Sequence, residues 1–318
     1  MYWYYKYIII ALALTGVGFG VFKLLPDDFL TSQEQPSTDE NAPPSSNKEE
    51  LNSNKALEPN VEKTVKTVEE FKKASFATPS SKYDSLFQKG IELKKNGMLD
   101  SAYDIFIECL SMCDEYSPEW QASANEISKI NIYIYKNSVP SKRKQSYSVK
   151  TGQTLWDFAN NNTTIRAVQV SNKIPLDSSV IHANQVLNFF GGDWEIKVSK
   201  SNFALQLLLD GKLFRFYKIG IGKDNRTPIG QFIIKGKKRE PTWKGYPFGH
   251  PENVLGTRWM RLTKISDGSN EGYGIHGTQE PESIGTASSL GCLRMRNEDV
   301  EELYDFIPDN KIKVTIED

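Results

Sequence analysis

The sequence predicts a multidomain protein with three folded parts: an N-terminal helical hairpin, a small βααβ domain, and a larger, mostly β domain with a sandwich or barrel-like core. Three observations carry this prediction. Apolar residues recur at helical spacing over residues 81–138. Strand-like and helix-like patterns follow one another within the short stretch 146–190, and many short strand patterns separated by Gly-containing turns fill residues 193–317. A chain of 318 residues is long enough for two or three such domains.

Residues 1–25 predict a single membrane-spanning anchor. No charged residue occurs from Tyr7 to Phe22, and Lys23 can extend its charged end toward the headgroups, so the apolar span approaches the ~20 residues that cross a bilayer. Lys6 precedes the span and two aspartates follow it, which places the N-terminus in the cytoplasm and the later domains outside the cell membrane. A cleaved signal peptide is the alternative, but no clear small-x-small cleavage site follows the span.

Residues 26–80 predict a disordered linker. They are rich in Ser, Pro, Asn, Glu and Lys and poor in large apolar side chains, so they cannot bury enough surface to offset the lost chain entropy. We expect this linker to hold the folded domains away from the membrane.

The helical segment 81–138 resembles one tetratricopeptide repeat. A small residue at Gly90, a turn at Gly97, and then Ala102 and Phe106 carry the resemblance. One repeat cannot bury both of its faces, because such arrays need about three or more repeats. We therefore expect a spacer or a dimer contact rather than a peptide-binding array, and the sequence identifies no protein partner.

The segment 146–190 predicts a compact βααβ unit. Tyr147 and Val149 alternate as in a strand, Gly152 supplies a turn, and Thr154 is suited to cap a helix. The whole segment resembles a LysM domain, a small module that binds glycans containing N-acetylglucosamine. The residues that match are Tyr147, Val149, Gly152, Thr154, Leu155, Trp156, Ala159, Asn172, Gln185 and Leu187. The resemblance implies glycan binding through Gly152, Thr154 and Asn172, and a spacer without affinity for sugar is the alternative.

Composition excludes several classes of function. The net charge is −1, so the chain lacks the basic excess of a nucleic-acid-binding protein. Three cysteines cannot form a complete disulfide framework. Cys109 and Cys113 are best explained as small apolar residues of a packed helix, since no His or Cys partners for a metal lie near them in the sequence. We expect neither a metal nor a cofactor.

The candidate chemistry lies in two glycine-flanked segments of the last third of the chain, YGIHGT around His276 and SSLGCLRM around Cys292. An imidazole that takes the thiol proton, or that rests beside the thiolate as an ion pair, makes the sulfur a nucleophile toward a carbonyl. Gly277 allows the chain to bend behind the histidine, whose second nitrogen is free to donate to a nearby carbonyl.

The residues around the cysteine suggest how a substrate is held. Gly291 permits close approach of a substrate, and the amides of Leu290, Gly291 and Cys292 are candidates for stabilising an oxyanion. We assign Ser289 to the same group. Arg294 is either structural or binds a substrate carboxylate by two hydrogen bonds.

Residues 193–317 resemble the catalytic domain of L,D-transpeptidases. The motifs that match, in order, are TPIGQF at 227–232, NVLGTRWM at 253–260, YGIHGT at 273–278, IG at 284–285 and SSLGCLRM at 288–295. Asp299 and the run LYDFI at 303–307 fit the closing helix of the family.

The resemblance implies a mechanism and a substrate. Cys292 attacks the carbonyl of the third residue of a peptidoglycan stem and releases D-alanine, with His276 as base and then acid, oriented by the carbonyl of Gly277. The amine of a second stem, or of a protein, then resolves the acyl-enzyme. A second stem yields a 3→3 cross-link. Many members carry His before the Gly-Cys pair, where this chain has Leu290. The expected partners are stem peptides and glycan strands.

Three other functions remain to be weighed. The same cysteine could transfer the acyl group to water, as in a carboxypeptidase or endopeptidase. A sortase is also a membrane-anchored cysteine enzyme that uses His and Arg. Its nucleophile, however, stands in a Thr-Leu-x-Thr-Cys motif, whereas Gly291 precedes Cys292 here. A non-catalytic wall-binding protein would be expected to lack Cys292 or His276, and both are present.

Overall fold

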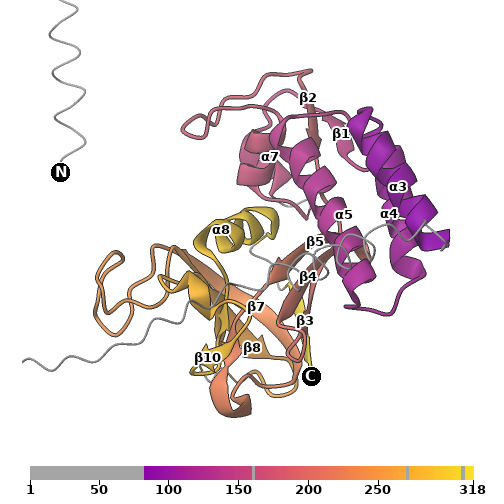
Figure 1. Ribbon diagram of the computed structural model, residues 1–318. Coiled ribbons are helices and arrows are strands. Elements are labelled where there is room, and N and C mark those ends of the chain that lie inside the picture. Colours follow the sequence, from indigo (N-terminus) through magenta and orange to yellow (C-terminus); the bar gives the residue numbers. More distant parts are fainter. Residues whose placement is uncertain (1–81, 160–161, 270–271, 309–311) are drawn as a thin grey trace, which may run out of the picture. The chain divides into compact units, whose positions relative to one another are not determined.

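The computed structural model describes residues 82–159, 162–269, 272–308 and 312–318, which Figure 1 shows as ribbons. The predicted anchor (1–25) and linker (26–80) lie outside these residues. Within the described part of the chain, no helix is both long and apolar enough to span a membrane.

Most strands of the C-terminal half form one eight-stranded sheet in the order β11-β9-β8-β7-β12-β3-β4-β5. Its strands are β3 (Trp194–Ser199), β4 (Ala204–Leu209), β5 (Lys212–Lys218), β7 (Gly230–Arg239), β8 (Arg258–Lys264), β9 (Gly274–His276), β11 (Leu293–Arg294) and β12 (Lys313–Glu317). Two short strands, β6 (Ile221–Gly222) and β10 (Ala287–Ser289), pair separately. Helix α8 (Asn297–Phe306) packs against β8 and β9. The prediction of a mostly β domain is confirmed.

The predicted hairpin turn at Asp210-Gly211 joins β4 and β5. Both residues have positive φ, at 51° and 73°, as a two-residue turn with the twist of paired strands requires. The alternation of apolar residues in this part of the sequence corresponds to one buried face of β3, because Trp194, Ile196 and Val198 are all buried.

Three helices precede the sheet: α3 (Lys82–Lys95), α4 (Leu99–Ser111) and α5 (Pro118–Lys136). Gly90 of α3 lies directly against the ring of Phe106 on α4, so the two helices approach closely at this point. Ser117 caps α5 by accepting a hydrogen bond from the backbone of Trp120 at 3.2 Å. Lys94 of α3 forms an ion pair with the buried Glu126 of α5.

Helix α5 covers β5, the last strand of the sheet. Ser128 Oγ accepts a hydrogen bond from the Phe216 backbone N–H at 2.9 Å, and Asn131 Nδ2 donates to the Phe214 carbonyl at 2.7 Å. These bonds satisfy backbone groups that an edge strand would otherwise leave without partners. The helices and the β domain therefore share one hydrophobic core, whereas the sequence indicated a separate spacer or dimer contact.

The segment between them contains, in order, β1 (Gln145–Ser148), α6 (Leu155–Phe158), α7 (Ile165–Ser171) and β2 (Val186–Phe189). Strands β1 and β2 pair antiparallel, with Gln145 opposite Phe189. A second, smaller hydrophobic cluster fills this unit. Its contacts with the catalytic half include the Trp194 indole N–H, which donates to the Asn162 carbonyl at 2.7 Å.

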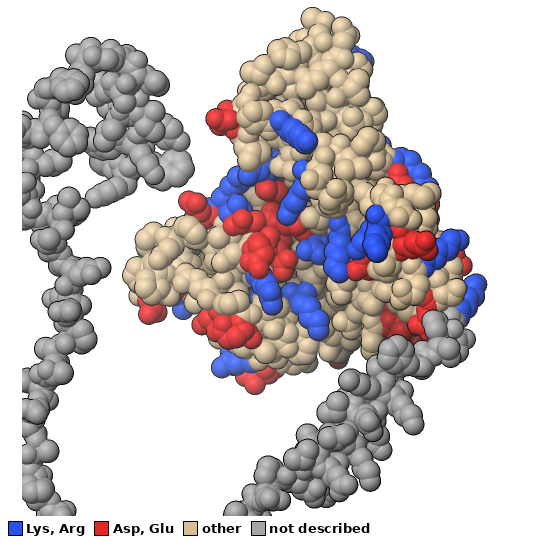
Figure 2. Space-filling view, turned by 45° about the horizontal axis from the view of Figure 1, so that its top comes forward, with Lys and Arg blue, Asp and Glu red and all other residues tan. Residues whose placement is uncertain are grey.

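Figure 2 shows acidic and basic side chains interspersed over the visible face of the molecule, without a large area of one sign. This mixture agrees with the small net charge of −1.

Candidate active site

Cys292 lies in the turn that joins β10 to β11, beside one end of the large sheet. Strand β11 pairs in parallel with β9, which places Leu293 opposite Ile275 and Arg294 opposite His276. Cys292 directly precedes β11, and His276 is the last residue of the neighbouring strand β9. The two candidate catalytic residues therefore come from the ends of adjacent strands.

His276 is held in one orientation. Its imidazole is buried, with 3% of the residue exposed, and Nδ1 lies 2.5 Å from the Gly277 carbonyl oxygen, which is the contact expected from the sequence. Since a carbonyl can only accept, Nδ1 carries the proton and Nε2 is left to accept one. The indole of Trp259, opposite His276 on β8, lies 5.7 Å from the imidazole between ring centroids.

Burial determines the charge state of both groups. It lowers the pKa of His276 to about 4, and the nearby charge of Arg294 acts in the same direction against the opposing effect of the Gly277 carbonyl. Burial also raises the pKa of the Cys292 thiol, although the Gly274 amide and Arg294 partly offset that increase. Both shifts favour a neutral thiol and a neutral imidazole over a thiolate–imidazolium ion pair.

Ser289 holds the turn that carries the cysteine. Its hydroxyl donates to the Cys292 carbonyl at 2.7 Å and accepts from the Gly291 N–H at 3.0 Å. The expectation that the Gly291 amide faces an oxyanion is therefore wrong, because that amide is bonded within the turn. The Leu290 side chain is 64% exposed.

Thr227 is a residue of this site to which the sequence assigned no role. Its hydroxyl accepts from the Gly222 N–H at 2.7 Å and donates to the Gly291 carbonyl at 2.9 Å, and the residue is buried. It thereby ties the cysteine turn to the segment before β7. The motif TPIGQF, which contains Thr227, was the only sequence feature that pointed to this residue. The motif could not reveal these hydrogen bonds, because they join segments that are distant in the sequence.

Glycine is required where the cysteine turn is packed most closely. Gly291 has a φ of 131°, and a side chain there would overlap the ring of Tyr273. A side chain at Gly222 would overlap the backbone of Gly291. The turn is therefore built against its neighbours rather than exposed as a free loop.

Asn297, the first residue of α8, supports the histidine segment, and the sequence did not indicate this role. Its Oδ1 accepts the Thr257 N–H at 3.2 Å. The same oxygen lies so close to Gly256 and Gly277 that neither position has room for a Cβ. The carbonyl that orients His276 thus belongs to a peptide packed against the Asn297 amide.

Arg294 forms an ion pair at the edge of the site. Its Nη1 donates to Glu280 Oε2 at 2.8 Å, and the Arg294 side chain is 13% exposed against 57% for Glu280. The Nε of Arg294 is buried without a hydrogen-bond partner. The sequence left open whether Arg294 is structural or binds a substrate carboxylate. The ion pair with Glu280 fits a structural role, and because the Glu280 carboxylate is exposed, a carboxylate of a ligand could also take its place.

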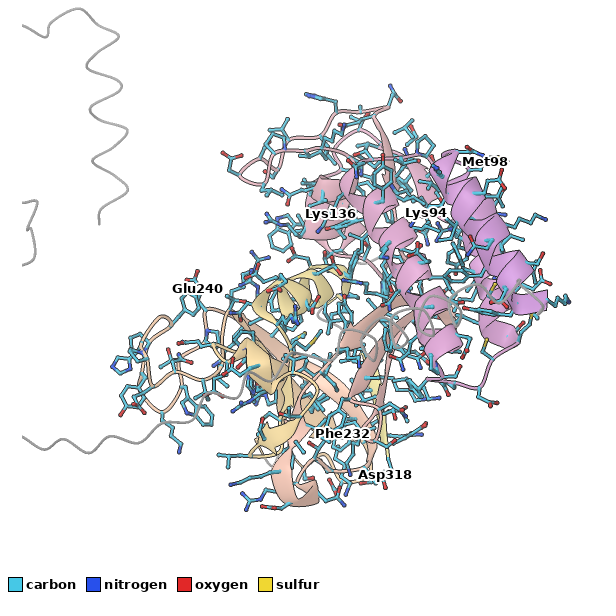
Figure 3. All side chains as sticks on the ribbon, in the orientation of Figure 1. Lys94, Met98, Lys136, Phe232, Glu240 and Asp318 are labelled. Atoms are coloured by element: carbon cyan, nitrogen blue, oxygen red, sulfur yellow. The ribbon has the colours of Figure 1, made fainter. Side chains whose placement is uncertain are left out.

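A long loop borders the histidine segment. Glu240, labelled in Figure 3, lies where the chain leaves β7 for this loop. Gln279 Nε2 donates to the Asn253 carbonyl at 2.8 Å and so ties the loop to the residues after His276. His250 of the loop stacks on Tyr246, at 4.5 Å between ring centroids. In the described residues, no group of three or more His, Cys, Asp or Glu side chains could hold a metal ion.

The candidate glycan-binding residues of the βααβ unit lie apart from this site in the sequence and differ in environment. Gly152 is in an exposed turn with a φ of 84°, and Thr154 precedes α6, where its hydroxyl donates to Asp157 at 3.0 Å. Asn172 accepts from the Asn188 N–H at 2.8 Å, and its amide donates to the Val168 and Asn188 carbonyls. These bonds join α7 to β2 and give Asn172 a structural role that does not depend on a ligand.

Known proteins match this chain over the same region. Residues 193–316 match the YkuD family, described as the L,D-transpeptidase catalytic domain. YqjB of Bacillus subtilis (strain 168) is 40% identical over 121 residues, which cover 37% of this chain and 68% of YqjB. YkuD of Bacillus licheniformis (strain ATCC 14580) is 34% identical over 177 residues, covering 54% of this chain and 97% of that protein. YkuD of B. subtilis (strain 168) is 33% identical over 177 residues, covering 54% and 98%. All three are named for the same family, and with its catalytic domain in residues 193–316 this chain belongs to the L,D-transpeptidase family of enzymes.

Proposed function

We propose that this enzyme forms cross-links in peptidoglycan with Cys292 as nucleophile and His276 as general base. The observation that carries the proposal is the buried imidazole, oriented by the Gly277 carbonyl at the end of β9, which pairs with the strand that directly follows Cys292. Ser289 and Thr227 support it further, because they hold the turn that presents the thiol.

The acylation step uses the neutral pair. The sulfur of Cys292 forms a bond to the carbonyl carbon of the third stem residue while the thiol proton moves to Nε2 of His276. The amides of Leu290 and Cys292 stabilise the oxygen that becomes negative. The bond to the terminal D-alanine then breaks, its amine takes the proton from the imidazole, and a thioester remains.

The second step requires an acceptor. The side-chain amine at the third residue of another stem attacks the thioester, gives its proton to His276, and forms an amide that cross-links two third residues. The Cys292 thiolate leaves and regains the proton. A protein amine would follow the same path and attach that protein to the wall. Water as acceptor makes the enzyme a carboxypeptidase or endopeptidase.

Arg294 contributes to substrate binding in this proposal. Its ion pair partner Glu280 is more than half exposed, so a substrate carboxylate can replace the Glu280 carboxylate on the guanidinium group. The positive charge also favours the thiolate that forms during each cycle.

The remaining parts of the chain would place the enzyme at its substrate. We propose that residues 1–25 anchor it in the cell membrane, with the linker and the catalytic domain in the extracytoplasmic space. The βααβ unit would act as a LysM-like module that binds glycan strands and raises the local concentration of stem peptides.

The first test is the intact mass of the full-length protein, kept soluble in mild detergent, after incubation with a carbapenem. A covalent adduct that disappears in Cys292→Ala would support a reactive, acylating thiol. A folded, reduced protein without an adduct would contradict the proposal and favour a non-catalytic wall-binding function.

A second test identifies the acceptor. Incubation with a purified disaccharide-tetrapeptide, followed by mass spectrometry of the products, distinguishes a dimer cross-linked between third residues from a disaccharide-tripeptide. The dimer is the expected product. Tripeptide alone would assign the carboxypeptidase activity to the same cysteine.

A further inference from the structure

A cavity of about 600 Å³ lies between the βααβ unit and the catalytic domain. Side chains of α6, α7, β7 and α8 form its walls. The residues used below are Trp156, Thr163, Arg166, Arg239, Tyr304 and Asp305. This volume is in the range of sites that bind small ligands.

One wall offers an aromatic face. Trp156 of α6 is 73% exposed, although Trp is a residue that folded proteins usually bury for the most part. An exposed indole has a flat apolar face and one N–H donor. This combination suits the apolar face of a sugar ring together with its hydroxyl groups.

The remaining walls carry more positive than negative charge. Arg166 Nε lies 3.4 Å from Asp305 Oδ2, and Arg239 Nη2 lies 3.6 Å from Asp305 Oδ1. One carboxylate thus faces two guanidinium groups. The Arg239 side chain is 52% exposed, so part of it is available to an anion from solution.

Several polar atoms of these walls lack hydrogen-bond partners within the described part of the chain. Asp305 Oδ1 and Arg166 Nε have none, since their ion pairs are too long or poorly directed for a bond. The hydroxyl of Thr163, a residue with 0% exposure, has none either. Buried polar groups without partners are rare in folded proteins and often mark a place for water or a ligand.

Helix α8 connects this cavity to the active site. Asn297 at its start supports the Gly277 peptide, while Tyr304 and Asp305 near its end line the cavity. Asp305 follows Asn297 by eight positions along the helix, a rise of about 12 Å. A long substrate held in the cavity would therefore lie near the residues that orient His276.

We propose that this cavity binds a glycan strand that carries carboxylates, with a sugar ring on Trp156 and the acidic groups on Arg166 and Arg239. The inference rests on the proposed function, for which such a strand with its acidic stem peptides is the substrate. The site includes Trp156 of the LysM-like unit but not the positions Gly152 and Thr154, and it adds residues of the catalytic domain. It would set the position of the strand relative to Cys292.

The test measures binding by calorimetry with the full-length Cys292→Ala protein in detergent. The probes are a peptidoglycan tetrasaccharide that retains its stem peptides and a neutral chitin tetrasaccharide. We expect Trp156→Ala to weaken binding of both probes about tenfold. Arg239→Gln should weaken only the acidic probe, by about fivefold, and added salt should reduce that difference.

Matched control variants are Tyr133→Ala, which removes an aromatic side chain from an exposed site on α5, and Lys212→Gln, which removes an exposed cation from β5. Both should bind like the parent. The inference is overturned if the parent binds neither probe, if the cavity variants bind both like the parent, or if Arg239→Gln affects the two probes equally.

A second readout separates this inference from the proposed function. In proteins that retain Cys292, Trp156→Ala and Arg239→Gln should leave the rate of carbapenem acylation unchanged, which also shows that they fold. If the parent is not acylated, the proposed function fails whatever the binding data show. If it is acylated but binding ignores the cavity variants, only this inference fails.

Discussion

The surroundings of Cys292, the proposed nucleophile, oppose the reactive thiolate form of its side chain. Burial raises the pKa of the thiol, while the Gly274 amide and the Arg294 charge lower it. The same burial keeps His276 neutral and able to accept a proton. In the proposed mechanism the thiol proton therefore moves to the imidazole during the attack on the carbonyl rather than before it.

This charge state predicts the pH dependence of acylation. The pKa of His276 is about 4, so the imidazole is neutral above about pH 5 and becomes protonated as the pH falls through 4. Protonated imidazole cannot take the thiol proton, so the carbapenem acylation rate should fall with a midpoint near pH 4. The measurement is the acylation rate against pH by intact mass. A midpoint near the ordinary His value of 6.5 would contradict this environment.

Asn297 predicts a second effect at the scale of single residues. In Asn297→Ala the Gly277 peptide loses the side chain packed against it, and the orientation of His276 becomes less defined. Misplacement of a catalytic group by about 1 Å costs on the order of 100-fold in rate. We expect kcat for stem-peptide turnover to fall by that order while KM changes little.

Two further measurements separate positioning from a purely structural role. Asn297→Asp keeps an oxygen acceptor at the start of α8 and should restore most of the rate. If Asn297→Ala instead lowers only the melting temperature and the folded protein reacts at the parent rate, the residue supports the fold alone.

At the scale of elements, α5 protects the free edge of β5 with polar side chains. Ser128→Ala and Asn131→Ala each leave a backbone group of β5 without its partner. We expect each variant to lower the free energy of unfolding by about 1–3 kcal/mol. Urea unfolding followed by circular dichroism measures this loss.

Ser111→Ala is the matched control, because that hydroxyl bonds the Glu108 carbonyl at an exposed end of α4. It should change the free energy of unfolding by less than about 0.5 kcal/mol. Equal effects of Ser111→Ala and Ser128→Ala would show that the bonds to β5 add nothing to stability.

The same helix shows why part of the fold could not be predicted. Apolar spacing identified the helices, but the buried face of α5 includes Ser123, Ser128 and Asn131, which a hydrophobic pattern does not register. Nothing in the sequence indicated that this face meets an edge strand 80 or more residues away. The strands and the Asp210-Gly211 turn were predicted because their signals are local.

The same distinction holds in the active site. Cys292 and His276 could be proposed as catalytic because each lies in a short motif with recognisable chemistry, and the predicted contact of His276 with the Gly277 carbonyl is present. Asn297 and Thr227 were missed because their bonds join segments that only the fold brings together. The Gly291 amide was assigned wrongly, since a neighbouring hydroxyl at Ser289 competes for it.

At the scale of the whole molecule, the shared core predicts that the helices and the catalytic domain unfold together. The ring of Trp120 on α5 lies 5.5 Å from that of Phe216 on β5, and the ring of Tyr135 lies 4.6 Å from that of Phe306 on α8. Contacts this extensive across an interface make separate unfolding of either part costly. Loss of helix, followed by circular dichroism, and loss of carbapenem acylation should therefore have the same urea midpoint.

A variant in this interface sharpens the test. Trp120→Ala removes a large side chain that is 6% exposed and should lower the free energy of unfolding by about 3–5 kcal/mol, moving both midpoints together. Tyr133→Ala, on the exposed side of the same helix, should move neither. Two separate midpoints, or a Trp120→Ala protein that loses helix yet keeps the parent midpoint for acylation, would show that the helices are an independent unit. A common shift of both urea midpoints would instead show that α5 unfolds together with the catalytic domain on which it packs.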